Sequence, residues 1–170
     1  MIKLIQNENE LDRSLLLKSL SGRKMLAYMK AYGAGYDFCR FYKITDETGE
    51  GFMFIINSTL IICADEKLEA TDELKFFVSM NMPFRVEGDT RILRNIADSD
   101  HYQVLNRTIF ELVPDEKSHE FEEEFVEFNP HLPDVYKILS EGFPNISDFS
   151  LWYTDTSHRC RHGISRVFTY

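Results

Sequence analysis

The chain has 170 residues, enough for one domain or for one domain and part of a second. Apolar residues make up 44% and charged residues 28%, a balance that excludes wholesale disorder. With 19 Lys and Arg against 28 Asp and Glu, the formal charge is −9. We therefore expect neither a dedicated nucleic-acid binder nor a protein that docks on an anionic membrane, because both need clustered basic residues.

The three cysteines, Cys39, Cys63 and Cys160, are widely spaced and odd in number. They predict neither a disulfide framework nor a metal knuckle. The first residues, MIKLIQNENELDR, contain no apolar secretion segment, and polar residues interrupt the longest apolar stretch, residues 51–64. We expect a cytoplasmic protein with free thiols.

The N-terminal stretch predicts a strand followed by two helices. Residues 2–5 have the pattern of a short edge strand, and Asn9 is expected to cap a helix whose leucines recur at helical spacing. Beyond Gly22 a second apolar helical face continues, and Gly33 and Gly35 are expected to end it.

Three antiparallel strands are expected next. Residues 36–44 are rich in aromatic side chains and predict a strand, which the polar turn at residues 46–49 ends. The apolar runs 52–56 and 59–63 are joined at Asn57 and Ser58, so they predict a buried hairpin.

Two helices and two strands complete the first segment. Residues 71–82 predict a helix with acidic residues in its favourable first turn, and residues 84–87 predict a short extended segment. Asp89 is expected to cap a helix, and residues 102–113 predict a long strand. Three large apolar side chains of this stretch are expected in the core: Met80, Met82 and Phe84.

An acidic run then separates two segments. Residues 114–124 carry six Asp and Glu, which is typical of a solvated linker, so we expect a domain over 1–113 and a second segment over 125–170. The second segment restarts the first pattern with a strand at 125–128, two helices and a strand at 165–170. Ser147 is expected to cap its second helix, and Gly163 to end it. Because a final strand leaves unpaired backbone, either it closes onto the first sheet or the natural protein continues; we favour continuation.

Three stretches carry a family resemblance: GAGYDFCRFY (33–42), FFVSMNMPFRVE (76–87) and DFSLWYTDTSHRCRHGISR (148–166). Together with the element order, they resemble the GNAT superfamily of N-acetyltransferases; in bacterial members the third stretch lies just before the catalytic core. The resemblance spans most of the chain. It implies an α/β (α+β) fold with a mixed, mainly antiparallel sheet flanked by helices. This would be a degenerate first GNAT-like unit followed by the beginning of a second.

The cofactor loop of that family is missing from its expected place. GNAT enzymes bind the acetyl-CoA pyrophosphate with [QR]-x-x-G-x-[GA] between the fourth strand and third helix, where backbone amides face the anion. Here residues 64–71 read ADEKLEAT, with no glycine and three carboxylates. Residues 30–35, KAYGAG, have the glycine spacing but follow a helix, so we interpret them as a helix end. Acetyl-CoA is thus expected for a full-length family member and not for this chain alone.

The helix predicted over residues 148–162 has two chemically different sides, at about 100° per residue. One side is expected in the core: Phe149, Trp152, Tyr153, Thr156 and Cys160. On the other side, Asp155, His158 and His162 allow three interpretations. In the first, they form a zinc site. In the second, they bind an acceptor amine or take its proton. In the third, Asp155 pairs with Arg159, and the two histidines lie near the helix C-terminus, which favours cations.

Two functions from different classes remain open. In the first, the chain is the N-terminal part of an N-acetyltransferase that moves acetyl from acetyl-CoA to a small amine, with Asp155, His158, His162 and Arg159 as acceptor-side candidates. Its partner would be a C-terminal catalytic half or a second chain. In the second, it is a non-catalytic GNAT-like module for dimerisation, as in a homodimer, or for ligand recognition. Cys39 and Cys160 are expected to be packing residues.

Overall fold

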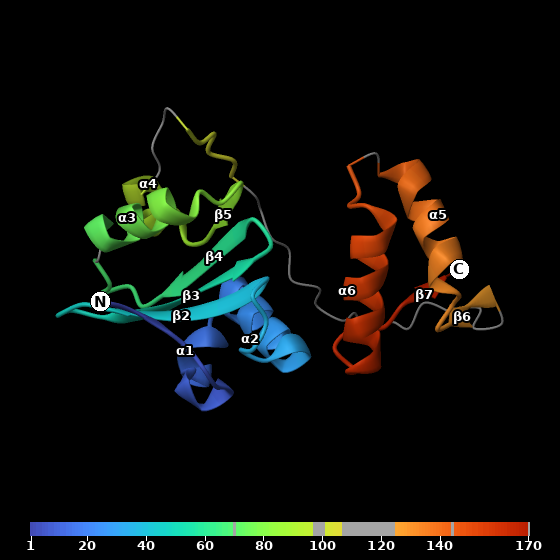
Figure 1. Ribbon diagram of the computed structural model, residues 1–170, viewed down its shortest axis with the longest axis horizontal. Helices are drawn as coiled ribbons and strands as arrows, with labels where there is room; N and C mark the ends of the chain where they lie inside the picture. The colour runs from blue at the N-terminus through green and yellow to red at the C-terminus, as the bar shows by residue number, and fades with distance from the viewer. Residues whose placement is uncertain (70, 97–100, 107–124, 144, 170) are drawn as a thin grey trace, which may run out of the picture. The chain divides into compact units, whose positions relative to one another are not determined.

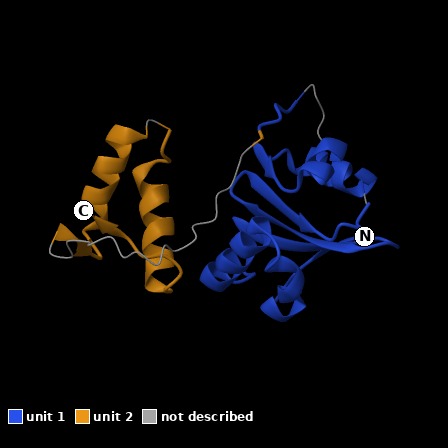
Figure 2. Cartoon of the chain, turned by 180° about the vertical axis from the view of Figure 1, so that it is seen from behind, with its two compact units in different colours: residues 1–105 blue, residues 106–170 orange. Residues whose placement is uncertain are grey.

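A computed structural model describes residues 1–69, 71–96, 101–106, 125–143 and 145–169. The chain divides into two compact units, Met1–Leu105 and Asn106–Tyr170, shown in Figure 2. The described residues contain six α-helices, a five-stranded sheet and a two-stranded sheet, so the expected α+β fold class is confirmed. None of the helices in these ranges is long and apolar enough to cross a bilayer.

The first unit is built on a five-stranded sheet (Figure 1). Its strands lie in sequence order: β1 (Ile2–Leu4), β2 (Cys39–Thr45), β3 (Glu50–Ile56), β4 (Thr59–Ala64) and β5 (Arg85–Glu87). Neighbours are antiparallel from β1 to β4, whereas β4 and β5 are parallel. The predicted hairpin turn is confirmed, with Asn57 in the left-handed region at φ 51°.

The helices begin at polar caps, although not always at the predicted residue. The single helix expected from Asn9 is instead a 3₁₀ turn, η1 (Glu8–Glu10), and a short helix, α1 (Arg13–Leu16). Extended backbone at Leu11 separates them, and Asp12 caps α1 by accepting hydrogen bonds from the Ser14 and Leu15 amides. The remaining helices of this unit are α2 (Leu20–Tyr32), α3 (Thr71–Asn81) and α4 (Thr90–Ile96).

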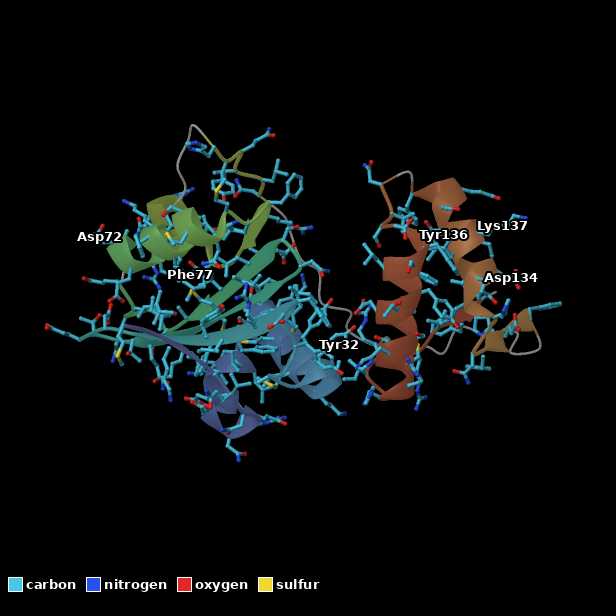
Figure 3. The ribbon with its side chains drawn as sticks, in the orientation of Figure 1. Tyr32, Asp72, Phe77, Asp134, Tyr136 and Lys137 are labelled. Atoms are coloured by element: carbon cyan, nitrogen blue, oxygen red, sulfur yellow. The ribbon has the colours of Figure 1, made fainter. Side chains whose placement is uncertain are left out.

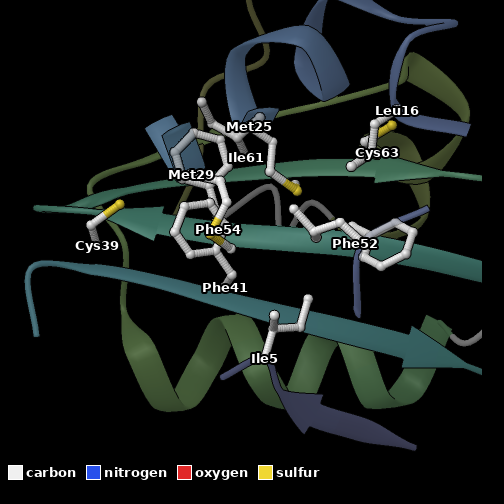
Figure 4. Close-up of a cluster of buried hydrophobic side chains, with 11 residues drawn as sticks. Ile5, Leu16, Met25, Met29, Cys39, Phe41, Phe52, Phe54, Ile61 and Cys63 are labelled. Atoms are coloured by element: carbon white, nitrogen blue, oxygen red, sulfur yellow. The ribbon is translucent and has the colours of Figure 1, made fainter. Parts of the chain in front are cut away.

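Helices cover both faces of this sheet because its central strand is buried on both sides. Along β3, Phe52 and Phe54 pack in one apolar cluster with residues of α1 and α2, shown in Figure 4. Met53 and Ile55 point the other way and pack with residues of α3 and α4. The result is three layers, with α1 and α2 on one side of the sheet and α3 and α4 on the other (Figure 1).

Two expectations for the first unit are wrong. Residues 102–106 are not in a strand, and the rest of that predicted strand and the acidic linker lie outside the described residues. Met80, Met82 and Phe84 are exposed rather than buried, with Phe84 at 87%. The buried residues of α3 are Leu74 and Val78, and at about 100° per residue Met80 lies on another side of this helix. Met82 and Phe84 follow the end of α3 at Asn81, where Met82 turns the chain at φ 42°.

The second unit consists of a helix pair and a small sheet. Its elements are β6 (Glu127–Phe128), α5 (Leu132–Gly142), α6 (Phe149–Arg161) and β7 (Phe168–Thr169). The two strands are antiparallel to each other, and both are shorter than predicted. Asp148, not Ser147, caps α6 by accepting a hydrogen bond from the Ser150 amide at 2.9 Å.

The described residues of this unit bury few side chains. Only Pro130, Val135 and Thr156 are buried there, while Phe128 and Phe168, opposite each other in the small sheet, are 68% and 61% exposed. A unit of this size normally buries far more apolar surface. The described residues of the second unit therefore leave many of their large apolar side chains exposed.

Candidate functional site

The connection between β4 and α3 occupies the place where the resemblance puts an acetyl-CoA loop. Because β4 and β5 are parallel, this connection leaves the carboxyl end of a parallel strand and enters the N-terminus of a helix. Such positions bind anions in many α/β proteins, since free amides and the helix dipole point outward. Whether the site can do so here depends on what already occupies those amides.

Carboxylates and a carbonyl of the chain itself occupy three of these amides. Asp65 Oδ1 accepts a hydrogen bond from the Lys67 amide at 2.9 Å, and the Asp65 carbonyl accepts one from the Leu68 amide at 3.1 Å. Asp46 lies in the turn between β2 and β3, and its Oδ2 accepts a hydrogen bond from the Glu69 amide at 2.8 Å. A carboxylate thus stands where a phosphate oxygen would bind.

Asp46 is itself held in place by its own turn. Its Oδ1 accepts hydrogen bonds from the Thr48 amide, the Thr48 hydroxyl and the Gly49 amide at 2.7–2.8 Å. The turn also lies against the loop, because a Cβ added to Gly49 would lie 2.7 Å from the Leu68 nitrogen. The turn and the loop therefore form one packed structure.

Arg91 of α4 closes the loop from the other side. Its Nη1 donates to the Leu68 carbonyl and its Nη2 to the Asp65 carbonyl, both at 3.0 Å. Leu68 itself is only 2% exposed and belongs to the apolar cluster under α3 and α4. The residues present therefore do not fit a pyrophosphate.

The glycine-containing segment at residues 30–35 ends a helix, as predicted. Gly33, at φ 67°, follows α2, and its amide donates to the Met29 carbonyl at 2.7 Å. Tyr32, labelled in Figure 3, packs its ring against Phe38 and Tyr36 at centroid distances of 5.2 and 6.1 Å. An aromatic cluster, not a phosphate cradle, follows the helix.

On α6 the acidic and basic candidates form local pairs. Asp155 Oδ2 lies 2.8 Å from Arg159 Nη2, so the predicted i, i+4 ion pair is confirmed. The rings of His158 and His162 stack, with centroids 4.3 Å apart and planes 29° apart. Asp155, His158 and Arg159 are half-buried, whereas His162 is exposed at the helix end.

This geometry bears on the zinc interpretation. Stacked imidazoles present their faces to each other, whereas zinc needs ring nitrogens that converge on one point. In the described ranges, no group of three or more His, Cys, Asp and Glu side chains could hold a metal ion. The zinc interpretation therefore has no geometric support among these residues.

The predicted core side of α6 is only partly buried. Trp152 is half-buried against Tyr136 of α5, which is labelled in Figure 3, at a centroid distance of 5.3 Å. Thr156 is buried. Phe149 and Tyr153, expected in the core, are each 40% exposed, and Cys160 is half-buried. Tyr136 of α5 contacts the rings of Phe149 and Trp152, at centroid distances of 5.1 and 5.3 Å, and this contact leaves part of the stripe exposed.

Asp46 and Arg91 are the residues that sequence reasoning missed. The Asp-x-x-Gly turn indicates that Asp46 bonds its own turn amides, since Asx side chains commonly do so. The contact with Glu69 has no local signal. No family model, no curated protein and no solved structure matches this chain.

Proposed function

We propose that the chain is the N-terminal part of a GNAT-family N-acetyltransferase, with the first unit as a non-catalytic GNAT-like unit. The observation that supports this most is the sheet. Its order is β1 to β5, it is antiparallel up to β4, and a helical crossover leads to the parallel strand β5. Up to α4, the order of the elements is the one on which the family resemblance rests, whereas residues 102–106 do not form the strand expected after α4. In this proposal the second unit begins the catalytic unit.

The first unit does not hold the cofactor in this proposal. Asp46 occupies the Glu69 amide, and the adjacent carboxylates would repel a pyrophosphate. Acetyl-CoA would bind to a part of the natural protein other than residues 1–105. The 170-residue chain alone is expected to be inactive.

The second unit would supply acceptor-side residues. His158 is the candidate that takes the proton of an amine, because an unprotonated imidazole nitrogen can accept a proton in general base catalysis. Asp155 and Arg159 would hold the helix surface beside it in one arrangement through their ion pair. His162, stacked on His158, would fix the orientation of that ring.

A specific observation favours the alternative, a non-catalytic module for dimerisation or ligand recognition. Besides Met1 at the start of the chain, four large apolar side chains of the first unit are more than two-thirds exposed: Phe76, Met80, Met82 and Phe84. Apolar side chains gathered in this way often mark an interaction surface. The alternative makes this surface, and not α6, the functional part of the chain.

Calorimetric titration with acetyl-CoA tests the first part of the proposal. The 170-residue chain is expected to show no binding up to millimolar acetyl-CoA. Micromolar binding would contradict the conclusion that its loop cannot accept the pyrophosphate.

Turnover of the natural full-length protein with acetyl-CoA and a panel of small amines tests the second part. His158→Ala should lower turnover and leave the circular dichroism spectrum unchanged. His131→Ala, which removes an exposed imidazole paired with Asp134, is the matched control. Absence of turnover with every amine would favour the non-catalytic module. Turnover unaffected by His158→Ala would remove the acceptor-side role from α6.

A further inference from the structure

The second unit contains a pocket whose lining does not include the residues proposed for acetyl transfer. It has a volume of about 460 Å³, within the size range of small-molecule sites. Residues beside β6, α5, α6 and β7 line it, so the whole pocket belongs to one unit. It lies on the Tyr153, Cys160 and Arg161 side of α6, away from His158 and His162 at about 100° per residue.

The lining combines an apolar wall with one cation. Pro130, Leu132 and Val167 supply aliphatic surface, and Tyr153 adds a ring that is 40% exposed. Among the lining residues that the structure describes, Arg161 supplies the only formal charge. Such a combination suits a ligand with an apolar body and one anionic group.

Arg161 is positioned to bind that anion. Its Nε donates to the Ser157 carbonyl at 3.3 Å, which orients the guanidinium along the helix. Within the described ranges no carboxylate pairs with Arg161, in contrast to Arg159, which pairs with Asp155. Its two terminal nitrogens therefore remain available for the paired hydrogen bonds that a carboxylate accepts.

The surrounding charge favours the same ligand. Residues 156–170 contain three arginines and two histidines but no Asp or Glu, although the chain as a whole carries −9. Of these arginines, Arg159 pairs with Asp155, which precedes the segment. A local excess of positive charge raises the concentration of anions near the pocket. This basic segment includes Arg161 of the pocket, and its charge favours the same class of ligand as the pocket lining.

We propose that this pocket binds a small monocarboxylate with an apolar body, whose carboxylate pairs with Arg161 and whose body lies on Pro130, Leu132 and Val167. This proposal does not depend on acetyl transfer. It assigns ligand recognition to the second unit whether or not the natural protein is an enzyme.

The test uses 3-phenylpropionate as the probe and 3-phenylpropanamide as its uncharged counterpart. The readout is the ¹H–¹⁵N spectrum of the 170-residue chain during titration. With 3-phenylpropionate, we expect saturable shifts at the backbone amides of Ser157, Cys160, Arg161 and Val167. We expect 3-phenylpropanamide to bind at least tenfold more weakly. The tenfold difference corresponds to loss of a charge-assisted hydrogen bond.

Two arginine variants separate a specific contact from general attraction. Arg161→Gln should weaken binding of 3-phenylpropionate about tenfold. Arg166→Gln removes the same charge from an exposed position outside the pocket and should change binding less than twofold. Equal effects of the two variants would show a general electrostatic attraction and overturn the proposal.

Cysteine labelling gives an independent readout with the unmodified chain. Cys39 and Cys63 are buried, so Cys160 is the thiol expected to react first with a disulfide reagent. Because Cys160 lines the pocket, 3-phenylpropionate should slow its reaction and the amide should not. Two results would overturn the proposal. One is the absence of saturable NMR shifts up to 10 mM 3-phenylpropionate, about the weakest affinity that such a site would show. The other is equal protection of Cys160 by both probes.

Discussion

Gly22→Ala should destabilise the first unit although the same change usually stabilises a helix. Gly22 lies in the first turn of α2, where replacement by alanine would gain up to about 1 kcal/mol from helix propensity. However, a Cβ at this position would lie 2.0 Å from the Leu16 carbonyl oxygen and 2.6 Å from the Leu16 Cα. Since a real Cβ essentially never lies within 3.0 Å of another heavy atom, the backbone would have to move by about 1 Å.

The cost of that movement outweighs the gain in propensity. Overpacking that forces such a shift costs about 1–3 kcal/mol, and Leu16 is fully buried, so it has little room to retreat. The movement would also stretch the 3.0 Å hydrogen bond from the Gly22 amide to the Ser19 hydroxyl, a cap worth about 1 kcal/mol. We expect a net loss of about 2 kcal/mol in the free energy of unfolding of the first unit.

Native-state hydrogen exchange at the β3 and β4 amides measures this free energy for the first unit alone. Gly142→Ala, in α5, is the matched control because nothing lies within 4 Å of the added Cβ. It should stabilise the second unit by about 0.5 kcal/mol, read from Trp152 fluorescence in urea. Increased protection of β3 and β4 in Gly22→Ala would refute the steric argument.

Two further predictions concern Trp152 and Cys63. Trp152→Ala should lower the free energy of unfolding of the second unit by about 1–3 kcal/mol. This loss is smaller than for a fully buried tryptophan, because Trp152 is half-buried against Tyr136. Urea denaturation followed by far-UV circular dichroism measures the loss, and a value below about 0.5 kcal/mol would contradict the packing. Burial raises the pKa of the Cys63 thiol, partly offset by its hydrogen bond with Ser19, so the folded state holds its proton to higher pH than the unfolded chain. This contribution to stability is complete below the unfolded pKa and is lost as pH rises through the folded pKa. Between pH 7 and 10 the melting temperature of the unmodified chain should fall. The fall should be smaller in Cys63→Ala and the same in Cys160→Ala. An equal fall in the unmodified chain and both variants would contradict this prediction.

The central strands could be predicted because their signals are local. The apolar runs on either side of Asn57 and Ser58 can only pair with each other, since a two-residue turn joins them. The end of α2 at Gly33 was equally readable, because glycine there takes a conformation that ends helices. Helix starts shifted by a few residues where several capping residues compete, as at Asn7, Asn9 and Asp12.

The missed features depend on contacts between distant segments. The Asp46 contact with Glu69 exists because pairing of Gly51 with Ala64 brings the turn before β3 beside the loop after β4. Exposure of Met80 and Phe84 could not be read from their apolar character, which is the same in a core and on an interaction surface. The pocket beside Arg161 combines residues before α5 with residues at the end of α6, so no single stretch of sequence reveals it.

The two edges of the first sheet have a consequence for aggregation. β3 and β4 contain the runs FMFII and LIIC, which would assemble into intermolecular fibrils if another chain reached them. The strands at the ends of the sheet, β1 and β5, are only three residues long and carry Lys3, Arg85 and Glu87. Short, charged edge strands are poor templates for a further strand. The amyloid-prone centre is thereby shielded for as long as both edges stay paired with their neighbours.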